Sequence, residues 1–382
     1  MRKFENPTRF ACALTLLTIA VACGGGGGSG GDGGGDPGEP PTARTAVVLT
    51  SDFTTSSLAT LPVEDPTAVT TDTQTFHGDA VARTFGNTVY VINRRGADNI
   101  QALDATGGYA TRWQCSVEDP ADPDVSQNPQ DLVDAGGGKG YVSLYASGVA
   151  VVDLNPSADC SGFVRKRIDL SSLADADGRT EPTRMVVLGD RLYVTLQLLD
   201  NFAPTDSSAL AVIDTTTDEL VGSIALSAPN PFSETKGLPV DDDGKIYVAE
   251  VGNFGVLDGG IERVDPATGR AEGHFITEED LGGDVNDFVI VSGSRGYAVI
   301  SDADFNYSLV RFDPGSGEVQ ATLASGGAYL PDVEYDDSSD QIFVASQDFS
   351  NPGIHVFAAD DSEVTSSPID TGLPPFVLNF ID

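Results

Sequence analysis

The side chains that could carry chemistry in this sequence are mostly carboxylates. The chain has 382 residues, with 58 Asp and Glu against 21 Lys and Arg, three His and four Cys. Its formal net charge is −37 at pH 7. A surface this acidic repels phosphate groups, so nucleic acid is excluded as a partner. The acids either solvate the surface or bind cations.

Nucleophile and histidine patterns are scarce. No G-x-S-x-G segment occurs. Ser233 and Lys236 of "SETK" match the S-x-x-K pattern, but they fall in a Pro- and Gly-flanked loop and not on a helix, so we interpret the match as coincidental. His274 and His355 fall in predicted strands and are predicted to be structural. No histidine pair has the spacing of a zinc site.

Two segments imitate calcium-binding loops. "DADG" (175–178) lacks the required acid two positions earlier. "DDDG" (241–244) is followed at the right spacing by Glu250, but the intervening "KIYVAE" is an apparent strand, which would carry Glu250 away from the ion. We therefore predict a β-turn at each segment.

The elements that must position these side chains repeat at intervals of about fifty residues. A short β-rich run with a central aromatic residue recurs at Tyr90, Tyr141, Tyr193, Tyr247, Tyr297 and Phe343, and residues 45–51 form a seventh copy with Val48 in that position. Each run follows an apolar segment and a tight turn. It precedes a third segment that commonly ends in Asp and a fourth, more polar one. The pattern predicts an all-β, seven-bladed β-propeller with four antiparallel strands per blade.

The two ends of the repeat array complement each other. Candidate innermost strands begin near Asp79, Asp131, Arg184, Leu238, Asp287 and Asp332. The seventh is the last stretch, "PPFVLNFID" (374–382), and residues 45–51 lack an inner strand of their own. The C-terminal strand is therefore predicted to complete the first blade and close the ring.

The repeats resemble the YVTN-type seven-bladed propellers of exported bacterial proteins. Residues 192–224, "LYVTLQLLDNFAPTDSSALAVIDTTTDELVGSI", match that pattern best, and the resemblance covers nearly all of residues 45–382. It implies the propeller fold and leaves function open, because relatives include surface proteins, lactonase-like enzymes and quinoprotein-like subunits. No catalytic residue is carried over from the family.

The loops that lead into the innermost strands of a propeller converge on one opening of the central channel. Aligning the repeats places eight polar residues there: His77, Asp79, Asp131, Arg184, Lys236, Asn286, Asp287 and Asp332. The four carboxylates would repel one another and gain proton affinity. Arg184 and Lys236 would supply part of the compensating charge. The rest would come from Ca²⁺ or another divalent cation, or from a ligand that carries an amine.

This channel mouth is the predicted ligand-binding site. The alternative is that the acids cap strand starts and point into bulk water. A second recurrence lies on the same face, where Asp or Asn precedes Phe in the loop after the second strand of five repeats: 51–53, 200–202, 252–254, 303–305 and 347–349. We interpret it as a turn residue followed by a Phe that fills the gap between blades. The alternative is a ligand-binding rim.

Cys115 and Cys160 are predicted to form a disulfide. Cys115 falls in the outer strand of one predicted blade and Cys160 beyond the third strand of the next, where neighbouring outer edges approach. An exported protein reaches an oxidising compartment, which permits the pairing. The alternative is two unpaired buried thiols.

The N-terminal residues predict export and a lipid anchor. Arg2, Lys3 and Arg9 precede an uncharged run over 10–22, which is too short to span a bilayer and suits a secretory signal. Ala20 and Ala22 before Cys23 resemble the lipobox of bacterial lipoproteins, with Ala20 in place of the usual leucine. This resemblance implies that Cys23 is lipidated. The alternative is an ordinary signal peptide cut after residue 22.

These features divide the chain into a lipoprotein signal peptide (1–22), a Gly-rich flexible tether (23–44) and the propeller (45–382). Because Gly24 follows the cysteine, the resemblance implies a cell-envelope location at the outer membrane. The leading hypothesis is a monomeric, non-enzymatic binding or scaffold module that takes a protein or a cationic small molecule. The alternative is a lactonase-like propeller hydrolase that uses channel-mouth carboxylates and a divalent cation. A third possibility is a subunit that works with a cofactor-bearing partner.

Overall fold

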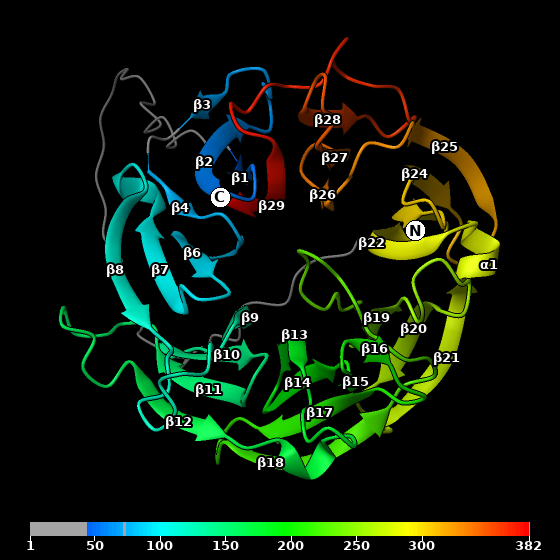
Figure 1. Cartoon of the computed structure of the whole chain (residues 1–382). Helices are drawn as coiled ribbons and strands as arrows, with labels where there is room; N and C mark the ends of the chain where they lie inside the picture. The colour runs from blue at the N-terminus through cyan, green and yellow to red at the C-terminus, as the bar shows by residue number, and fades with distance from the viewer. Residues whose placement is uncertain (1–43, 72–73, 382) are drawn as a thin grey trace, which may run out of the picture.

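The computed structural model describes residues 44–71 and 74–381, which form a ring of β-sheets around a central channel (Figure 1). The ring has seven blades of four antiparallel strands, so the predicted fold is confirmed. Among these residues, no helix is long and apolar enough to cross a bilayer. Residues 1–22 and Cys23 lie outside the described residues.

The blades are numbered in chain order, and the strands of each are given from the channel outward. Blade 1 contains β29 (Pro375–Ile381), β1 (Thr45–Ser51), β2 (Thr55–Pro62) and β3 (Thr70–Thr71), and β4 (Phe76–His77) also pairs with β2. Blade 2 contains β5 (Ala80–Phe85), β6 (Thr88–Asn93), β7 (Asn99–Asp104) and β8 (Ala110–Ser116). Blade 3 contains β9 (Pro129–Asp134), β10 (Lys139–Leu144), β11 (Gly148–Asp153) and β12 (Val164–Ile168).

The remaining blades follow the same plan. Blade 4 contains β13 (Pro182–Leu188), β14 (Arg191–Leu196), β17 (Ala209–Asp214) and β18 (Glu219–Ala225), and it carries the hairpin β15 (Leu199–Asp200) and β16 (Ala203–Pro204). Blade 5 contains β19 (Ile246–Glu250), β20 (Gly260–Asp265) and β21 (Arg270–Thr277). Blade 6 contains β22 (Asp284–Ser292), β23 (Arg295–Ser301), β24 (Tyr307–Phe312) and β25 (Val319–Ser325). Blade 7 contains β26 (Asp332–Asp336), β27 (Gln341–Ser346) and β28 (Gly353–Phe357).

Two blades have an irregular fourth strand. In blade 7 the outer position is taken by the bridges Ile354–Ile369 and Phe357–Glu363. In blade 5 the inner position is taken by the bridges Pro231–Glu250 and Val240–Ile246. The helical elements are short: η1 (Ala105–Gly107), η2 (Ser171–Leu173) and α1 (Glu278–Leu281).

The C-terminal strand closes the ring as predicted. β29 pairs antiparallel with β1, from Thr45 opposite Ile381 to Thr50 opposite Pro375. β29 also contacts β5 of blade 2 and β26 of blade 7. The first and last parts of the chain thus share one blade, which leaves no open sheet edge at the junction (Figure 1).

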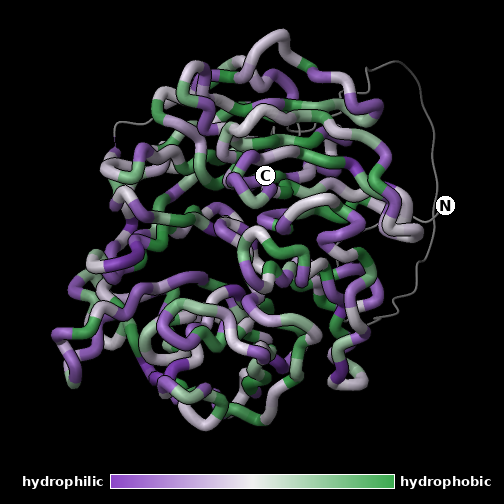
Figure 2. Tube along the Cα trace, turned by 45° about the vertical axis from the view of Figure 1, so that its right-hand side comes forward, coloured by the Kyte–Doolittle hydropathy of each residue, from purple (hydrophilic) through white to green (hydrophobic). Residues whose placement is uncertain are grey.

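The core lies within and between the blades, and in Figure 2 hydrophobic segments follow the stacked strands. The aromatic residues that mark the repeat are part of it, since Tyr141, Tyr297 and Phe343 are all fully buried. The Tyr141 hydroxyl donates to Asp218 Oδ1 in blade 4 (2.6 Å), and the Tyr297 hydroxyl donates to Asp361 Oδ1 beside blade 7 (2.8 Å). Each ring therefore fills the core, and two of the hydroxyls also tie one blade to the next.

Aspartates end the third strands and form the turns. The Oδ1 atoms of Asp104, Asp214 and Asp265 each accept a hydrogen bond from the backbone N–H two residues later, at 3.1, 2.8 and 2.8 Å. The Lys245 hydrogen bond, followed by the turn N–H groups, lowers the pKa of Asp265 to about 2. Much of the acidity of the chain therefore serves the hairpin turns.

Candidate ligand-binding mouth of the central channel

Three of the predicted mouth aspartates lie inside the channel wall and not at its opening. Asp131, Asp287 and Asp332 are 0%, 1% and 1% exposed. Each accepts a backbone N–H from the inner strand of the next blade: Met185 N to Asp131 Oδ2 (2.8 Å), Val333 N to Asp287 Oδ2 (2.9 Å) and Leu378 N to Asp332 Oδ2 (2.7 Å). These side chains fasten neighbouring blades together.

The difference from the prediction has a simple cause in the strand boundaries. β9 begins at Pro129 and β22 at Asp284, so Asp131 and Asp287 are interior residues of their strands and not residues of the preceding loops. Asp332 is the first residue of β26, yet it is buried against β29. A carboxylate inside the wall has no water to solvate it, so it takes its hydrogen bonds from the backbone.

Residues 231–239 (PFSETKGLP) form a plug in the channel, and the inner strand of blade 5 that was predicted to begin near Leu238 is reduced to the bridge at Val240. The segment leaves the sheet after the Pro231 bridge and returns at the Val240 bridge. In Figure 1 the chain before β19 reaches toward the centre of the ring. Thr235 at its tip is fully buried, and its hydroxyl donates to Pro331 O at 3.2 Å.

Basic side chains hold the carbonyl groups of the plug. Arg184 donates to Ser233 O through Nε and Nη2 (2.9 and 2.7 Å) and to Gln130 O through Nη1 (2.5 Å). Arg83 Nη1 donates to Thr235 O at 2.6 Å, and Arg83 Nε lies 2.7 Å from Asp131 Oδ1. Complete burial, followed by the repulsion of Arg83, lowers the pKa of Arg184 to about 9. The sequence analysis did not identify Arg83.

Lys236 holds the far end of the plug. Its Nζ donates to Val333 O (2.8 Å) and lies 2.5 Å from Glu334 Oε1. Burial alone would lower the pKa of Lys236, but the carboxylates of Glu334, Asp287 and Asp332 raise it well above its usual value. Arg184 and Lys236 therefore anchor the plug. Their positive charges, which were predicted to compensate carboxylates at the mouth, instead bind backbone carbonyl groups of the plug and of blade 7. Ser233 Oγ accepts the Lys236 backbone N–H (3.1 Å), which agrees with our interpretation of S-x-x-K as coincidental.

Asp332 is the most strongly perturbed acid of this group. Burial, and next the charge of Asp287, raise its pKa well above the usual value. The Oδ1 atoms of Asp287 and Asp332 have no hydrogen-bond partner in the described part of the chain. Asp287, Asp332, Glu334 and Lys236 thus form one charge cluster, in which the two aspartates are buried and Glu334 is partly exposed.

The open part of the mouth is a cavity of about 330 Å³ above the plug. Its charged lining includes Asp79, Arg94 and Glu234. Arg94 Nε donates to Asp79 Oδ1 (2.9 Å), and Arg94 Nη2 lies 3.3 Å from Glu234 Oε1. The remaining lining residues are Arg95, Asn128, Gln130, Tyr145, Thr183, Arg184, Gln197, Leu199, Phe202, Pro204, Asn230, Pro231, Phe232, Ser233 and Phe254.

A second, aromatic lobe of about 350 Å³ adjoins this cavity and shares Phe232, Glu234 and Phe254 with it. We call it the aromatic lobe; its other lining residues are Asn286, Phe305, Tyr307, Tyr329, Leu330 and Pro331. Asn286, a predicted site residue, is held there by donating from Nδ2 to Asp284 O (3.0 Å) and Ser301 Oγ (2.9 Å).

His77 stands beside the mouth and is not among the residues that line either cavity. Its backbone N–H donates to Asn93 Oδ1 (3.0 Å), and its Nδ1 accepts the backbone N–H of Asp79 (3.2 Å). His77 therefore orients the chain at Asp79. Of the eight predicted mouth residues, Asp79, Arg184 and Asn286 line the two cavities.

The Asp/Asn–Phe recurrence forms an exposed aromatic rim, and our gap-filling interpretation of the Phe is wrong. The rings are strongly exposed: Phe53 58%, Phe202 77%, Phe254 44%, Phe305 56% and Phe349 fully. Three of them, Phe202, Phe254 and Phe305, line the mouth cavities. The turn role of the acid is confirmed at Asp52, whose Oδ1 accepts Thr54 N (2.8 Å) and Thr55 N (2.7 Å).

The other histidines have structural partners. His274 Nε2 lies 2.6 Å from Oε2 of Glu250, which is fully buried and also accepts Ala228 N (3.0 Å). His355 Nδ1 lies 2.6 Å from Glu363 Oε1. Glu250 ends β19, which confirms that a strand separates it from the turn at 241–244. Over residues 44–71 and 74–381, no group of three or more His, Cys, Asp or Glu is arranged to hold a metal ion.

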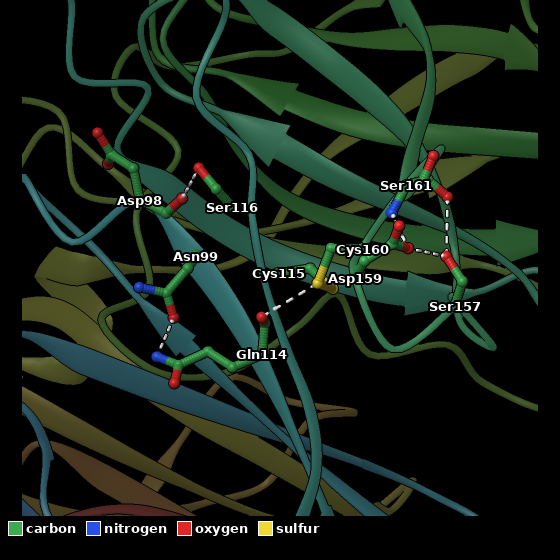
Figure 3. Close-up of a disulfide and its surroundings, with 9 residues drawn as sticks. All are labelled: Asp98, Asn99, Gln114, Cys115, Ser116, Ser157, Asp159, Cys160 and Ser161. Atoms are coloured by element: carbon green, nitrogen blue, oxygen red, sulfur yellow. Dashed lines mark hydrogen bonds between the residues drawn. A yellow bond between two sulfur atoms is a disulfide. The ribbon is translucent and has the colours of Figure 1, made fainter.

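Cys115 and Cys160 form a disulfide, with a Cα–Cα distance of 5.6 Å (Figure 3). Cys115 belongs to β8, the outer strand of blade 2, and Cys160 follows β11 of blade 3. This is the pairing between neighbouring outer edges that the sequence predicts. Figure 3 also shows Cys160 Sγ near Gln114 O, at 3.2 Å.

Comparison with known proteins supports the fold alone. No protein-family model matches the chain, and no curated protein matches it. Among solved structures, a putative 6-phosphogluconolactonase from Bacteroides fragilis is similar with a TM-score of 0.57 and 13% identity, over 91% of this chain and all of that one. A quinoprotein alcohol dehydrogenase-like protein from Bacteroides thetaiotaomicron has a TM-score of 0.56 and 11% identity, over 88% and 77% of the two chains.

A dihydro-heme d1 dehydrogenase has a TM-score of 0.55 and 15% identity, over 89% of this chain and 75% of that one. The three neighbours share the propeller and differ in their names and chemistry. The fold defines this protein as a β-propeller. Its function has to be inferred from the residues at the mouth of its own channel.

Proposed function

We propose that this protein is a lipid-anchored binding protein of the cell envelope, and that its ligand site is the mouth of the channel. The observation that carries the proposal is the pair of adjoining cavities, of about 330 and 350 Å³, whose floor is the plug. Each has the size of a small-molecule site and combines apolar rings with a few polar groups. The plug contacts blades 2, 4 and 7 across the channel beneath them, so we expect a ligand to enter and leave through the rim.

The position of the tether supports access to the mouth. β1 runs from Thr45 to Ser51, and the rim residue Phe53 follows its end. The segment that precedes Thr45 therefore joins the propeller at the opposite end of this strand, about 20 Å from the rim at 3.3 Å per residue. A lipid on Cys23 would then be joined to the propeller by a flexible tether that attaches away from the rim, which would leave the mouth open to solutes.

The alternative of a lactonase-like hydrolase needs mouth carboxylates that can coordinate a divalent cation. Asp131, Asp287 and Asp332 instead accept backbone N–H groups inside the wall, and Asp79 is paired with Arg94. These three wall aspartates are buried and do not line either mouth cavity, so they do not present oxygen ligands to a cation there. A binding role requires no change in these side-chain contacts.

The anchor is tested with Cys23→Ala. The parent protein should be recovered with membranes and require detergent for release, whereas the variant should be exported and soluble. Membrane recovery of the variant equal to that of the parent would contradict the anchor.

The ligand site is tested by ligand-observed NMR with a mixed library of organic cations, anions and neutral molecules. Bound compounds should lose affinity in Phe254→Ala, because Phe254 lines both cavities, and keep it in Phe349→Ala, the matched rim residue that lines neither. If no compound binds, or if both variants bind like the parent, the mouth is not the ligand site.

A further inference from the structure

The aromatic lobe gathers five aromatic rings from separate segments of the chain. Phe232 lies on the plug, Phe254 in the loop after β19, Phe305 in the loop before β24, Tyr307 at the start of β24, and Tyr329 in the loop before β26. Ring centroids are 5.5 Å apart for Phe232–Phe254, 6.4 Å for Phe254–Phe305 and 5.1 Å for Tyr307–Tyr329. The pairs Phe232–Phe254 and Tyr307–Tyr329 are edge-to-face, at interplanar angles of 83° and 66°.

One carboxylate, Glu234, lies in the wall of this lobe. Within the described chain, its side chain has one charged neighbour in contact, Arg94, whose Nη2 lies 3.3 Å from Oε1. The same guanidinium is held more closely by Asp79, through Nε at 2.9 Å. One arginine therefore faces two carboxylates, and the group of three retains a net negative charge.

The negative charge of Glu234 reaches the rings of the lobe. Burial is the main cause that raises the pKa of Tyr329, and the charge of Glu234 is the next. The same two causes, in the same order, raise the pKa of Tyr307. No lysine or arginine lines the aromatic lobe, as far as the described residues define it. Its lining thus offers five aromatic rings and one carboxylate.

This combination selects among ligand classes. An anion would be repelled by Glu234 and by the formal charge of −37 on the chain. A bare Ca²⁺ or Mg²⁺ needs about six or more oxygen ligands, whereas most of this wall is aromatic carbon. A neutral apolar molecule would displace water from the partly exposed Glu234 carboxylate, whose contact with Arg94 is 3.3 Å long, and would supply no positive charge in return. An alkylated ammonium group fits both parts, because its positive charge attracts the carboxylate and its methyl groups pack on ring faces.

We propose that the aromatic lobe binds the quaternary or methylated ammonium group of a small organic cation, with Glu234 as its counter-ion. This proposal rests on the proposed function, in which the mouth is the ligand site, and it names the ligand class. The polar cavity beside the lobe, with Asn128, Gln130 and Arg95, would take the rest of such a ligand.

The test uses choline and its neutral isostere 3,3-dimethylbutan-1-ol, which replaces the ammonium nitrogen by carbon. Isothermal titration of the purified exported protein should show binding of choline that is at least about tenfold tighter than that of the isostere. Glu234→Gln and Phe254→Ala should each weaken choline binding by about five- to thirtyfold. Glu318→Gln, an exposed acid at the β24–β25 turn, and Phe349→Ala are the matched controls and should bind like the parent.

Each outcome decides one claim. Equal binding of choline and the isostere, lost in Phe254→Ala, would overturn the cation specificity and leave the mouth as the ligand site. Failure of choline to bind the folded parent protein at tens of millimolar would overturn the ammonium proposal, while the library screen would still test the mouth. Choline binding that is unchanged in both Glu234→Gln and Phe254→Ala would place the cation elsewhere and overturn the proposal. Circular dichroism of every variant ensures that a lost signal does not come from unfolding.

Discussion

Replacing Asp131 by Asn should destabilise the propeller far more than replacing Asp287 by Asn. Both aspartates are buried on inner strands, and both accept a backbone N–H from the next blade. They differ in their second oxygen. Asp131 Oδ1 accepts Leu132 N at 2.8 Å and faces Arg83 Nε at 2.7 Å, whereas Asp287 Oδ1 has no hydrogen-bond partner in the described chain.

The magnitudes follow from this difference. An asparagine at position 131 has only one accepting oxygen. Its NH₂ group must therefore face either the Met185 N–H, or the Leu132 N–H together with Arg83. The variant also leaves the Arg83 guanidinium without its counter-charge, and breaking a buried ion pair costs about 3–5 kcal/mol. An amide at position 287 keeps the Val333 hydrogen bond and removes a charge that repels Asp332 and attracts Lys236, two effects of opposite sign. We expect that variant to stay within about 1 kcal/mol of the parent.

Urea unfolding monitored by Trp113 fluorescence measures the difference. Trp113 is the only tryptophan, and its ring lies 6.0 Å from that of Tyr90 and 5.3 Å from that of Phe163. With a urea slope of about 3 kcal/mol per molar, a loss of about 3 kcal/mol lowers the midpoint by about 1 M. Equal midpoints for the two variants, or a lower midpoint for Asp287→Asn, would refute the assigned roles of these residues.

Three further predictions concern stability. Reduction of the Cys115–Cys160 disulfide, or replacement of both cysteines by Ala, should cost about 2–4 kcal/mol in the same assay, and an unchanged midpoint would contradict this. Burial raises the pKa of Glu250 from 4.5 to about 8, and the Glu250 carboxylate raises that of His274 although burial alone would lower it. Both groups bind protons more tightly in the folded state, so their contribution to the free energy of unfolding should decline as pH rises from about 4.5 to about 8. Thermal melts over this pH range should show the decline, and Glu250→Gln should make the melting temperature less dependent on pH. Tyr141→Phe removes the hydrogen bond to Asp218 and should cost about 1 kcal/mol, with Tyr145→Phe, a tyrosine at the mouth, as the control.

The fold was predictable because the same strand pattern recurs in the sequence of each blade. The aromatic residue of each second strand marks the same place in every blade, and the missing inner strand at residues 45–51 matches the spare strand at the C-terminus. Blade 5 is the exception, and its sequence contains the signal. Pro239 falls directly after Leu238, where the inner strand was expected to begin, and proline cannot donate to a strand ladder.

The mouth was less predictable because it depends on strand boundaries to within one or two residues. Asp131 was placed at a strand entrance, but β9 begins two residues earlier, and this difference moves the carboxylate from the opening into the wall. In a strand, a shift of one residue also exchanges the two faces. Local patterns do not fix such boundaries, and the arginines that hold the plug act through contacts between distant segments, such as Arg83 with Thr235.

Folding explains only one part of the repeated Asp/Asn–Phe motif at the aromatic rim. The turn after the second strand requires Asp or Asn, and Asp52 meets that need with its own carboxylate. The phenylalanine is not required for the turn, and at Phe53, Phe202 and Phe305 it has the left-handed backbone conformation that bulky residues rarely adopt, with φ of 63°, 67° and 59°. Fully burying an exposed Phe side chain would stabilise the protein by about 1.5–3 kcal/mol, yet all five rings remain exposed, and three of them, Phe202, Phe254 and Phe305, line the mouth cavities. A ligand that covers Phe202, Phe254 and Phe305 would give their exposure a purpose that folding does not, and this is why we propose the mouth of the channel as the ligand site.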